Sequence, residues 1–515
     1  MGASFFAFGG FRSPGEFVRY NRNISGRRCG SAVRGSDLRA AIFYNIAMQF
    51  QDKSFFFVGV AGSGMSAIAE YLAGNGVAVS GSDRKFSDSD GDDIRKKLEA
   101  SGVRTFPQDG SGVQKNLSAI VVSTAIEDSN PDLKRALELG IPRMHRSEML
   151  AEISENVKTI CVSGTSGKST VTGMIWHILN EAGLSPSLLS GAGLVSLEKR
   201  GMIGNGIAGK GCWLVAESDE SDGTLVRYSP EIGVILNIGK DHKEISELQK
   251  IFAEFANNVA GKGKTLIVNE ADALANAYSE NHLDDFGLEA KAGVQGMDFK
   301  PDGYRISFRV RHGGELVQFR VPLPGFHNMM NALAAVAVSL KVGVSLRKCA
   351  EALESFEGIH RRHQILGTFR GVTVVDDFAH NPAKIEASIR AAQDFTEGRV
   401  VAYFQPHGFG PTRFLRNDLV DAISKTLRAR DAIFFSEIYY AGGTVTRDIS
   451  SADLASDLKK KNSEAYFVAD RGECGRKMLE YAAPGDTILV MGARDPSLSE
   501  FAKTLARELE NERTK

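Results

Sequence analysis

The sequence predicts an α/β protein of three domains, and three observations lead to this fold class. From Phe55 onward, short apolar runs alternate with helical patterns, which is typical of parallel α/β layering. The 515 residues leave room for about three domains of ~150 residues each. Two glycine-rich turns, each between an apolar run and a helical pattern, lie in different parts of the chain. We expect the domains to span residues 51–152, 153–322 and 323–515.

Residues 1–50 are set apart from these domains. They carry seven arginines against two acidic residues, Glu16 and Asp37. A transit peptide has this kind of composition. We favour an irregular leader, or a start codon placed too early, because Met48 stands just ahead of the first apolar run.

Apolar runs predict the strands of the first two domains. In the first domain these runs are FFFVGV, VAVSGSD and SAIVVSTA. In the second they are KTICVSG, CWLVAES, IGVILNI and KTLIVNE. The second domain closes with a predicted hairpin, because YRISFRV and ELVQFRV alternate apolar and polar residues around Gly313-Gly314.

The third domain follows PLPG, residues 322–325, which we interpret as a linker. Its predicted strands are GVTVVDDFA, RVVAYFQP, DAIFFSEI, AYFVAD and DTILVMGA. Helical patterns separate them, so a third α/β unit is expected.

The composition excludes several functional classes. The chain is 43% hydrophobic and 24% charged with a formal net charge of −1, so no basic excess indicates nucleic acid binding. The five cysteines form no CxxC pair, which favours a reducing compartment and argues against a disulfide scaffold or zinc site. No apolar run reaches ~18 residues, so no membrane span is expected. These features favour a cytoplasmic protein.

The first glycine loop has the spacing of a dinucleotide fingerprint. Gly62, Gly64 and Ala67 fit G-x-G-x-x-A between a strand and a helix, and Asp83 follows about twenty residues later. Glycines allow the backbone to approach a diphosphate, and the helix directs its positive end at that anion. The requirement is for a diphosphate rather than a nicotinamide, so a nucleotide sugar fits equally well.

The second glycine loop, Gly164-Thr165-Ser166-Gly167-Lys168-Ser169, is a relaxed P-loop, since Val162 stands where the strict motif has its first glycine. Its backbone N–H groups can wrap phosphates, Lys168 supplies a positive charge, and the Ser169 hydroxyl can bind Mg²⁺. Two phosphate loops in separate domains imply two phosphorylated ligands.

Acidic residues follow a predicted strand in WLVAESDESDG. Glu217 comes directly off the strand and is the best further Mg²⁺ ligand, whereas Asp219, Glu220 and Asp222 are interpreted as a solvated loop. His242 follows another strand end, and its spacing alone favours a structural histidine over a ligand.

Seven motifs together resemble the Mur ligases, in order and spacing, from about residue 53 to the end of the chain. They are VGVAGSGMSAIAEYL with SGSD, VVSTAIEDSNPDL, VSGTSGKST, VAESDESDG, LPGFHNMMNALAA, RRHQILG with VTVVDDFAHNP, and FQPH. The alanine-adding members of the family are the most similar.

The resemblance implies a Rossmann-like N-terminal domain for a UDP-linked sugar acid, a central P-loop ATPase-like domain for ATP, and a Rossmann-like C-terminal domain for the amine. ATP and Mg²⁺ then convert the carboxylate of a UDP-N-acetylmuramate-type substrate into an acyl phosphate. The amine of an amino acid, by default L-alanine, or of a peptide attacks it, and an amide of peptidoglycan precursor synthesis results.

The resemblance also implies roles for individual residues. The UDP-sugar residues are Gly62, Ser63, Gly64, Met65, Ser66, Asp83, Ser123 and Thr124. The ATP residues are Gly164, Thr165, Ser166, Gly167, Lys168, Ser169, Thr170, His327, Asn328, Asn331, Arg362 (or Arg361) and Asp377. The metal ligands are Ser169, Glu217 and His242, and the catalytic residues are Lys168, Glu217, His242, His407 and Arg413.

The sequence departs from the family pattern in the amine pocket. After FQPH, Gly408 and Pro411 replace two arginines, and only His407 and Arg413 remain. Arginine binds a carboxylate through two hydrogen bonds, which glycine and proline cannot do. Arg413 or Arg494 is therefore the candidate for the contact with the carboxylate, and the sequence does not decide the identity of the incoming amine. Phe378, Asn381 and Ser166 also replace the usual tyrosine, histidine and histidine.

Three alternatives compete with this assignment. A family paralogue would join a different amine or a peptide in cell-wall recycling. An NAD-dependent oxidoreductase would use Gly62, Gly64 and Asp83, but Lys168 and Ser169 would then have no role. A non-catalytic module would bind nucleotides without an amine site.

Overall fold

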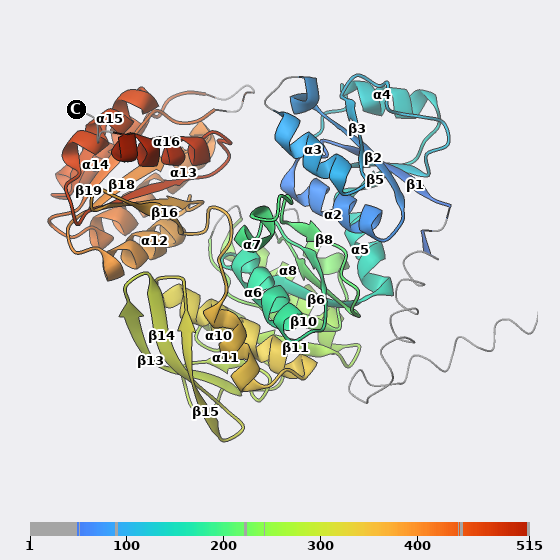
Figure 1. Ribbon diagram of the computed structural model, residues 1–515, viewed down its shortest axis with the longest axis horizontal. Coiled ribbons are helices and arrows are strands. Elements are labelled where there is room, and N and C mark those ends of the chain that lie inside the picture. Colours follow the sequence, from blue (N-terminus) through green and yellow to red (C-terminus); the bar gives the residue numbers. More distant parts are fainter. Residues whose placement is uncertain are drawn as a thin grey trace, which may run out of the picture.

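The computed structural model describes residues 49–50, 52–87, 91–220, 224–240, 243–440, 442 and 446–511. Residues 1–48 of the leader lie outside the described residues. His242 also lies outside them. The N-terminal and C-terminal domains both lie on the central domain (Figure 1). The expected three-domain α/β architecture is confirmed. Among the described residues, no helix is both long and apolar enough to span a membrane.

The N-terminal domain has a parallel sheet in the order β3-β2-β1-β4-β5. Its strands are β1 (Ser54–Val58), β2 (Ala78–Asp83), β3 (Arg104–Pro107), β4 (Ala119–Val122) and β5 (Arg143–His145). Its helices are α2 (Ser63–Gly74), α3 (Asp92–Ala100), α4 (Pro131–Glu138) and α5 (Arg146–Asn156). β3 and β5 escaped the sequence analysis because they are short and contain no fully buried residue.

The central domain contains a second sheet, in the order β11-β10-β6-β9-β7-β8, in which only β8 runs antiparallel. Its strands are β6 (Lys158–Ser163), β7 (Ser187–Leu189), β8 (Gly206–Ile207), β9 (Trp213–Glu217), β10 (Ile232–Ile235) and β11 (Thr265–Val268). Its helices include α6 (Lys168–Glu181), α7 (Val195–Glu198), α8 (Ile245–Ala260) and α9 (Ala273–Asn276). Because β6 lies between β9 and β10, the loops that follow these three strands meet at one edge.

A smaller sheet, β12-β13-β14-β15, is attached to the central domain. Its strands are β12 (Phe286–Gly287), β13 (Val294–Asp302), β14 (Arg305–His312) and β15 (Glu315–Val321). The expected hairpin is confirmed, since β14 and β15 pair antiparallel from Ile306↔Val321 to His312↔Glu315. Gly313 and Gly314 turn it with φ of 53° and 86°, a conformation that favours glycine.

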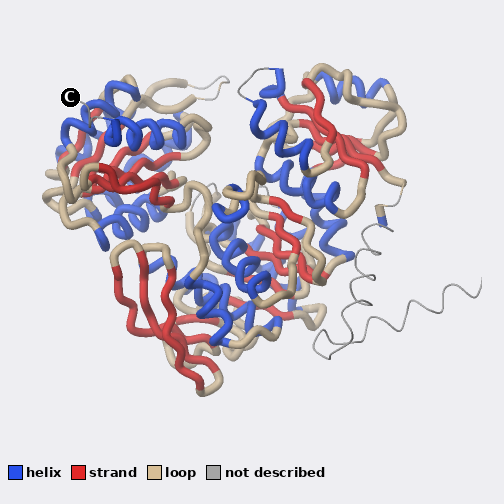
Figure 2. The backbone as a smooth tube through the Cα atoms, in the orientation of Figure 1, coloured by secondary structure: helices blue, strands red, loops and turns tan. Residues whose placement is uncertain are grey.

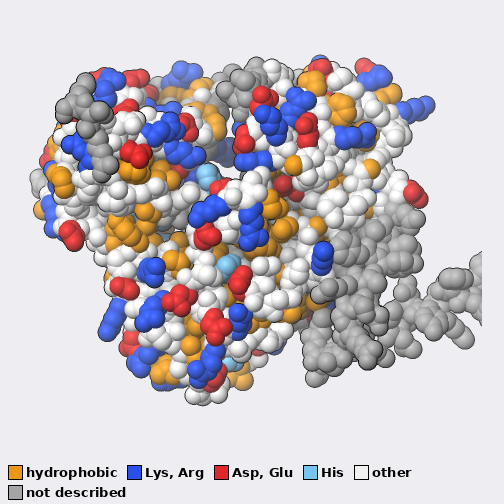
Figure 3. All heavy atoms as spheres, in the orientation of Figure 1, with side chains coloured by type: hydrophobic (Ala, Val, Ile, Leu, Met, Phe, Trp, Pro, Cys, Tyr) orange, Lys and Arg blue, Asp and Glu red, His pale blue; other side chains and the backbone are white. Residues whose placement is uncertain are grey.

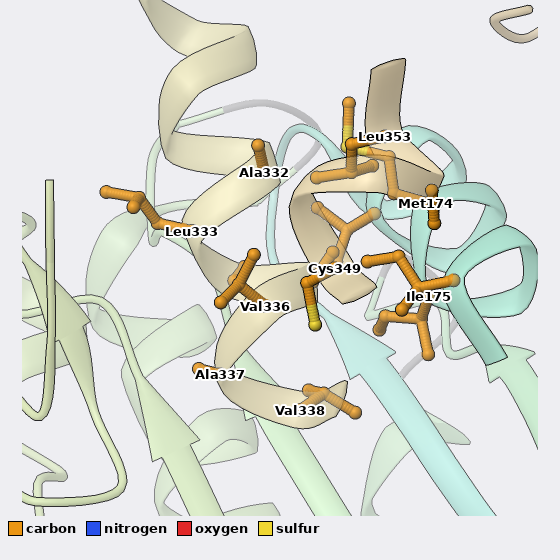
Figure 4. Close-up of a cluster of buried hydrophobic side chains, with 14 of the residues drawn as sticks. Met174, Ile175, Ala332, Leu333, Val336, Ala337, Val338, Cys349 and Leu353 are labelled. Carbon is orange, nitrogen blue, oxygen red and sulfur yellow. The ribbon is translucent and has the colours of Figure 1, made fainter. Parts of the chain in front are cut away.

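The expected domain edge at residues 322/323 is wrong. Helices α10 (Phe326–Val342) and α11 (Leu346–Glu354) pack into the central core, where Cys349 of α11 lies beside Ile175 of α6 (Figure 4). Leu333 of α10 belongs to the same core cluster. The core extends to Ile359, which pairs with Leu194. PLPG therefore connects β15 to α10 inside one domain. The other expected edge, at 152/153, falls within α5.

The C-terminal domain contains the sheet β16-β17-β21-β18-β19-β20, parallel except for β16. Its strands are β16 (Gln364–Phe369), β17 (Val372–Asp377), β18 (Val400–Gln405), β19 (Ala432–Phe435), β20 (Glu464–Phe467) and β21 (Thr487–Gly492). α12 (Pro382–Phe395), α13 (Phe409–Thr426) and α14 (Ser451–Lys460) cover one face, and α15 (Arg471–Tyr481) and α16 (Leu498–Asn511) cover the other (Figure 2). Helices on both faces of a mainly parallel sheet agree with the Rossmann-like expectation.

The N-terminal and central domains share a closely packed interface along α2. A Cβ at Gly206 would come within 2.5 Å of the carbonyl oxygen of Ala67, and one at Gly74 within 2.7 Å of the Ala208 Cβ. The Asn205 side-chain amide donates to the Ser66 hydroxyl at 2.9 Å and to the Ser63 carbonyl at 2.6 Å. Small residues and these hydrogen bonds hold the two domains together.

Glu70 is a buried carboxyl on α2, one helical turn from both Ser66 and Gly74. It is 5% exposed, and its Oε2 has no hydrogen-bond partner among the described residues. Burial raises the pKa of Glu70 to about 8. The folded protein therefore holds this carboxyl protonated at neutral pH, whereas the unfolded chain ionises it.

We expect Glu70→Gln to stabilise the protein at pH 7 by on the order of 3 kcal/mol. Between about pH 4.5 and 8 the unfolded chain binds fewer protons at this position than the folded protein, so wild-type stability falls as the pH rises. The gain from the substitution should grow over that range and then level off. Thermal midpoints from pH 5 to 8 measure it, with the exposed Glu138→Gln of α4 as the control. An equal midpoint for Glu70→Gln and wild type at pH 8 would contradict the expectation.

Candidate active site

The first glycine loop, between β1 and α2, borders a cavity of about 360 Å³. Asp83 at the end of β2 holds this loop, because its carboxylate accepts hydrogen bonds from the backbone N–H groups of Ala61 and Lys85, both at 3.1 Å. The N-cap of α2 is Gly62, which has no side chain to cover the end of the helix. The positive end of α2 therefore faces the cavity, which Gly62, Ser63 and Gly64 line. The lining residues are Gly59, Ala61, Gly62, Ser63, Gly64, Met65, Asp83, Arg84, Lys85, Gln108, Ser123, Ala125, Ile126 and Arg146.

Three cations at this cavity, Arg84, Lys85 and Arg146, were not singled out from the sequence. The Arg146 guanidinium lies against Gly64, where a Cβ would be 2.2 Å from its Nη1. Cations and helix N–H groups around one cavity suit a diphosphate. Arg146 directly follows β5, and a strand of three residues left too weak a signal to place it.

Two of the expected UDP-sugar residues are not at the cavity. Ser66 is fully buried, and its hydroxyl is engaged by Ser63 and Asn205 at the domain interface. Thr124 is exposed, whereas Ser123 before it and Ala125 after it line the cavity. Ser66 has a structural position here, because the face of α2 that carries it is covered by the central domain.

The second glycine loop lies between β6 and α6 and is held by Asn237, which follows β10. The Asn237 side chain accepts a hydrogen bond from the Ser166 N–H at 2.8 Å and donates one to the Ser166 carbonyl at 2.9 Å. Gly164 and Gly167 have φ of 137° and 88°, so both require glycine. The loop thus directs the first N–H groups of α6, which have no partner within the helix, at one point. The sequence analysis missed Asn237 because its partner, Ser166, is 71 residues earlier in the chain and follows a different strand.

Lys168 is the first residue of α6, and its ammonium is buried among acidic side chains. It donates to the Glu220 carboxylate at 2.7 Å and to the Gly164 carbonyl at 2.8 Å, and Asp219 is 3.8 Å away. Burial alone would lower the pKa of Lys168, but Glu220, Asp219 and Glu217 outweigh it and raise the pKa, so the side chain stays charged. The interpretation of Glu220 as part of a solvated loop is wrong, because this residue is 4% exposed.

The side chains of Ser169 and Glu217 lie on the same edge of the sheet as Lys168. Glu217 ends β9 opposite Val162 of β6, and its Oε2 accepts a hydrogen bond from the Gly191 N–H at 2.7 Å. A hydroxyl and a carboxylate are oxygen ligands of the kind that Mg²⁺ prefers. The third expected ligand, His242, lies outside the described residues.

Arg362 connects the C-terminal side of the site to the phosphate loop. Its Nη2 donates to the Ser169 hydroxyl at 3.4 Å, and its guanidinium lies 4.9 Å from the Phe378 ring centroid. Burial lowers the pKa of Arg362, which Glu217 and Asp377 oppose. Arg361 and His363 on either side have φ of 54° and 51°, a strained conformation for these residues.

The sequence left Arg361 and Arg362 as alternatives, and the structure separates them. Arg361 is 6% exposed and donates to Asp376 at 3.0 Å and to the Gly492 carbonyl at 2.9 Å. These partners lie inside the C-terminal domain. Arg361 therefore supports the fold, and Arg362 alone reaches the phosphate loop.

The first turns of α10 bring three expected ATP residues to the same place. A Cβ at Gly167 would be 2.6 Å from the Asn331 Oδ1, so Asn331 packs directly on the phosphate loop. Asn328 is buried and donates to the Pro324 carbonyl at 2.7 Å while accepting from Asn331 at 3.0 Å. Burial, with His363 nearby, lowers the pKa of His327 to about 4, so its imidazole is neutral at pH 7.

Asp377 ends β17 and faces this group from the C-terminal domain. Burial opposes its ionisation, but His363, Ser388 and Arg362 outweigh it and lower the pKa of Asp377. Its carboxylate accepts from the Ser388 hydroxyl and the Ala379 N–H, both at 2.8 Å. Asp377 is thus a fixed anion beside Arg362.

The two residues expected at the amine, His407 and Arg413, do not lie in the same cavity in the structure. His407 lines a second cavity, of about 300 Å³, but Arg413 pairs with Asp448 outside it. The structure therefore gives no support to Arg413 as a ligand in this cavity. The other candidate, Arg494, is exposed at the end of β21. The lining residues are His380, Phe404, Pro406, His407, Gly410, Pro411, Thr412, Phe414, Leu415 and Leu419.

The residues at and around the phosphate loop fit a magnesium–nucleoside triphosphate. Leu236 and Asn331 leave no room for a Cβ at Gly164 or Gly167, so that backbone can approach phosphates closely. Lys168 of the central domain and Arg362 of the C-terminal side both offer cations at the phosphate loop, and Ser169 and Glu217 offer metal ligands. The surface is hollowed where the outer domains face each other (Figure 3).

The central domain has a phosphate loop, one flanking domain has a cavity suited to a diphosphate, and the other flanking domain has a second cavity. This arrangement is that of a three-domain ATP-dependent ligase. Sequence comparison agrees over most of the chain. Residues 54–158 match the Mur ligase family, catalytic domain, residues 162–339 the Mur ligase middle domain, and residues 361–494 the Mur ligase, glutamate ligase domain. The chain belongs to the Mur ligase family, whose members are ATP-dependent amide ligases.

Individual relatives are similar along almost their whole length. A UDP-N-acetylmuramate–L-alanine ligase of Geotalea uraniireducens is 32% identical, covering 88% of this chain and 98% of its own. The enzyme of the same name from Desulforapulum autotrophicum is 35% identical, covering 85% and 95%. The crystal structure of the UDP-N-acetylmuramate-alanine ligase of Thermotoga maritima superposes with a TM-score of 0.73 at 25% identity, covering 89% and 100%. The oxidoreductase alternative is therefore wrong.

Proposed function

We propose that the protein joins the carboxylate of UDP-N-acetylmuramate to the amino group of an amino acid, using ATP and Mg²⁺, as a step of peptidoglycan precursor synthesis. L-alanine, which appears in the names of the relatives, is the reference amine. The observation that best supports this proposal is the hydrogen bond from Arg362 to Ser169. It brings a cation from the C-terminal side, where the amine would bind, to the phosphate loop, where ATP would bind. Since ATP and UDP-sugars are cytoplasmic substrates, we place the enzyme in the cytoplasm.

The proposed reaction has two steps. The γ-phosphoryl group of ATP passes to a carboxylate oxygen, which produces ADP and an acyl phosphate. The amine nitrogen then attacks the acyl carbon, the C–O bond to phosphate breaks, a proton leaves the nitrogen, and an amide remains. Phosphate turns a carboxylate oxygen into a good leaving group, and closure of the domains would exclude water from this intermediate.

The residues of the chain supply electrostatic stabilisation and position. In the first step two anions meet, and the positive charges of Lys168 and Arg362 reduce their repulsion. Ser169 and Glu217 would hold Mg²⁺, which neutralises charge on the phosphate oxygens. Arg84, Lys85 and Arg146 would hold the UDP diphosphate, which fixes the carboxylate near the phosphate loop.

An ADP-release assay with the purified chain tests this proposal. ATP, Mg²⁺ and UDP-N-acetylmuramate are supplied with L-alanine, other amino acids or short peptides, and products are identified by mass. We expect ADP release to require both the sugar acid and an amine, and one amide to form per ADP. Absence of ADP release with every amine would refute the proposal and favour a non-catalytic module. Turnover with peptides alone would identify a recycling paralogue.

A further inference from the structure

The cavity that contains His407 has an unusual lining for a site that receives an amino acid. It lies at the carboxyl end of β18 and against the first turns of α13. Six of its ten lining residues have apolar side chains, namely Phe404, Pro406, Pro411, Phe414, Leu415 and Leu419. Among the described residues, no lysine, arginine, aspartate or glutamate lines it.

Two series of contacts connect this cavity to the phosphate loop. In the first, the Arg362 guanidinium lies on Phe378, the Phe378 ring is 5.6 Å from His380, and His380 is 5.6 Å from His407. In the second, Gly239 donates to the Thr165 hydroxyl at 2.9 Å, and the next residue, Lys240, lies 4.3 Å from the Phe414 ring. The cavity therefore adjoins the place where the acid would be activated.

Two polar side chains of the cavity, His380 and His407, lie close together beyond the end of β18, and the Thr412 hydroxyl donates to the Gly408 carbonyl at 2.8 Å. Helix α13 begins with Gly408 as an N-cap that has no side-chain hydrogen bond. The N–H groups of the first turn of a helix attract anions. In α13 these are the N–H groups of Phe409 and Gly410, because Pro411 has none and the Gly408 N–H donates to the Tyr439 carbonyl at 2.8 Å. A carboxylate could thus bind between two imidazoles and the start of α13, although no arginine is present.

We propose that this cavity selects an α-amino acid whose side chain is apolar and larger than the methyl group of alanine. The carboxylate lies at the start of α13 beside His380 and His407, and the side chain fills the space bounded by Phe404, Leu415 and Leu419. A charged side chain would lose its hydration among Phe404, Leu415 and Leu419, which offer it no hydrogen bond or opposite charge. The inference rests on the proposed function and names the amine that the ligase uses.

The size of the cavity supports a larger side chain. A volume of about 300 Å³ reaches the ~300–1,000 Å³ range of pockets that bury most of a drug-sized ligand, so it exceeds what a methyl side chain needs. A methyl group would leave most of the apolar wall without contact. Each additional methylene that a hydrophobic pocket accommodates improves kcat/KM by roughly 10- to 200-fold.

The test compares amines in the ADP-release assay, with UDP-N-acetylmuramate as the acid. L-alanine, L-valine, L-leucine, L-methionine and L-phenylalanine are compared with L-aspartate, L-glutamate and L-lysine. We expect kcat/KM for the best of the large apolar amino acids to exceed that for L-alanine by at least tenfold, with the charged amino acids below L-alanine. Equal or better use of L-alanine, or a preference for a charged amino acid, would overturn the inference while the proposed function stands. If no amine releases ADP, the proposed function itself fails.

Gly410→Leu provides a second test, in which the cavity is changed and the amines are kept. Gly410 lines the cavity, and a Cβ there would meet no atom within 4 Å, so a side chain can start from this position in α13 without a clash at its Cβ. We expect at least a tenfold loss of kcat/KM for the preferred large amine and a smaller change for L-alanine, mostly through KM. The matched control is Gly472→Leu in α15 of the same domain, an exposed position that should change neither value. A uniform loss for both amines in Gly410→Leu would contradict a role in side-chain selection.

Discussion

A Lys168→Ala protein is expected to lose ATP turnover to background while it binds UDP-N-acetylmuramate as tightly as wild type. The Lys168 ammonium is the cation at the end of the phosphate loop, where α6 begins, and no other described lysine contacts Gly164. Removal of charge that stabilises the transition state of phosphoryl transfer costs roughly 10³-fold or more. The UDP-sugar cavity lies in a different domain with its own cations. ADP release and calorimetric titration with UDP-N-acetylmuramate measure the two effects separately.

The variant needs a stability control, because Lys168 is the buried partner of Glu220. Removing one member of a buried ion pair costs about 3–5 kcal/mol, so Lys168→Ala combined with Glu220→Gln should restore the thermal midpoint without restoring turnover. Arg146→Ala gives the opposite pattern, with weaker UDP-sugar binding and intact ATP binding. Parallel loss of both ligands in Lys168→Ala, in a protein that still folds, would show that the two sites are not separate.

Arg362→Ala is expected to lower kcat by about 10³-fold or more, since an arginine that stabilises phosphoryl transfer contributes about 10³ to 10⁵. The fold should be preserved, because its hydrogen bond to Ser169 at 3.4 Å is long and its other contacts are to the Phe378 ring and nearby charges. Arg362→Lys should recover part of the rate, as lysine keeps the charge but not the planar geometry.

Arg361→Ala is the informative comparison, because it removes the neighbouring guanidinium. We expect a lower thermal midpoint from the loss of its contacts to Asp376 and Gly492. The exposed Arg390→Ala of α12 controls for a general loss of positive charge in this domain. A larger loss of kcat in Arg361→Ala than in Arg362→Ala, at temperatures where both proteins are folded, would reverse the assignment.

Much of the fold was predictable because its signals are local. Apolar runs such as KTICVSG and DTILVMGA are long enough to mark buried parallel strands, and they correspond to β6 and β21. The alternation on either side of Gly313-Gly314 predicted the hairpin correctly. The phosphate loop was also found from the sequence, since its backbone turn, lysine and serine are contiguous.

Other features escaped because residues far apart in the sequence create them. α10 is apolar on several sides, and its sequence does not indicate that it packs between α6 and the small sheet, so the domain edge was misplaced. Glu220 was read as solvated because its partner, Lys168, comes from another strand end. Arg413 was expected at the amine, but its guanidinium has its partner, Asp448, on the surface.

The sequence by itself determined the fold class, the family resemblance and the positions of both glycine loops, because each depends on neighbouring residues and their backbone geometry. Only the tertiary structure decided which charged side chains face the ligands. It placed Arg362 on the phosphate loop and Arg361 in the fold, and it left the amine cavity with an apolar wall. The physical reason is that the direction of a long charged side chain is set by burial and by the partners within its reach, and these come from distant parts of the chain.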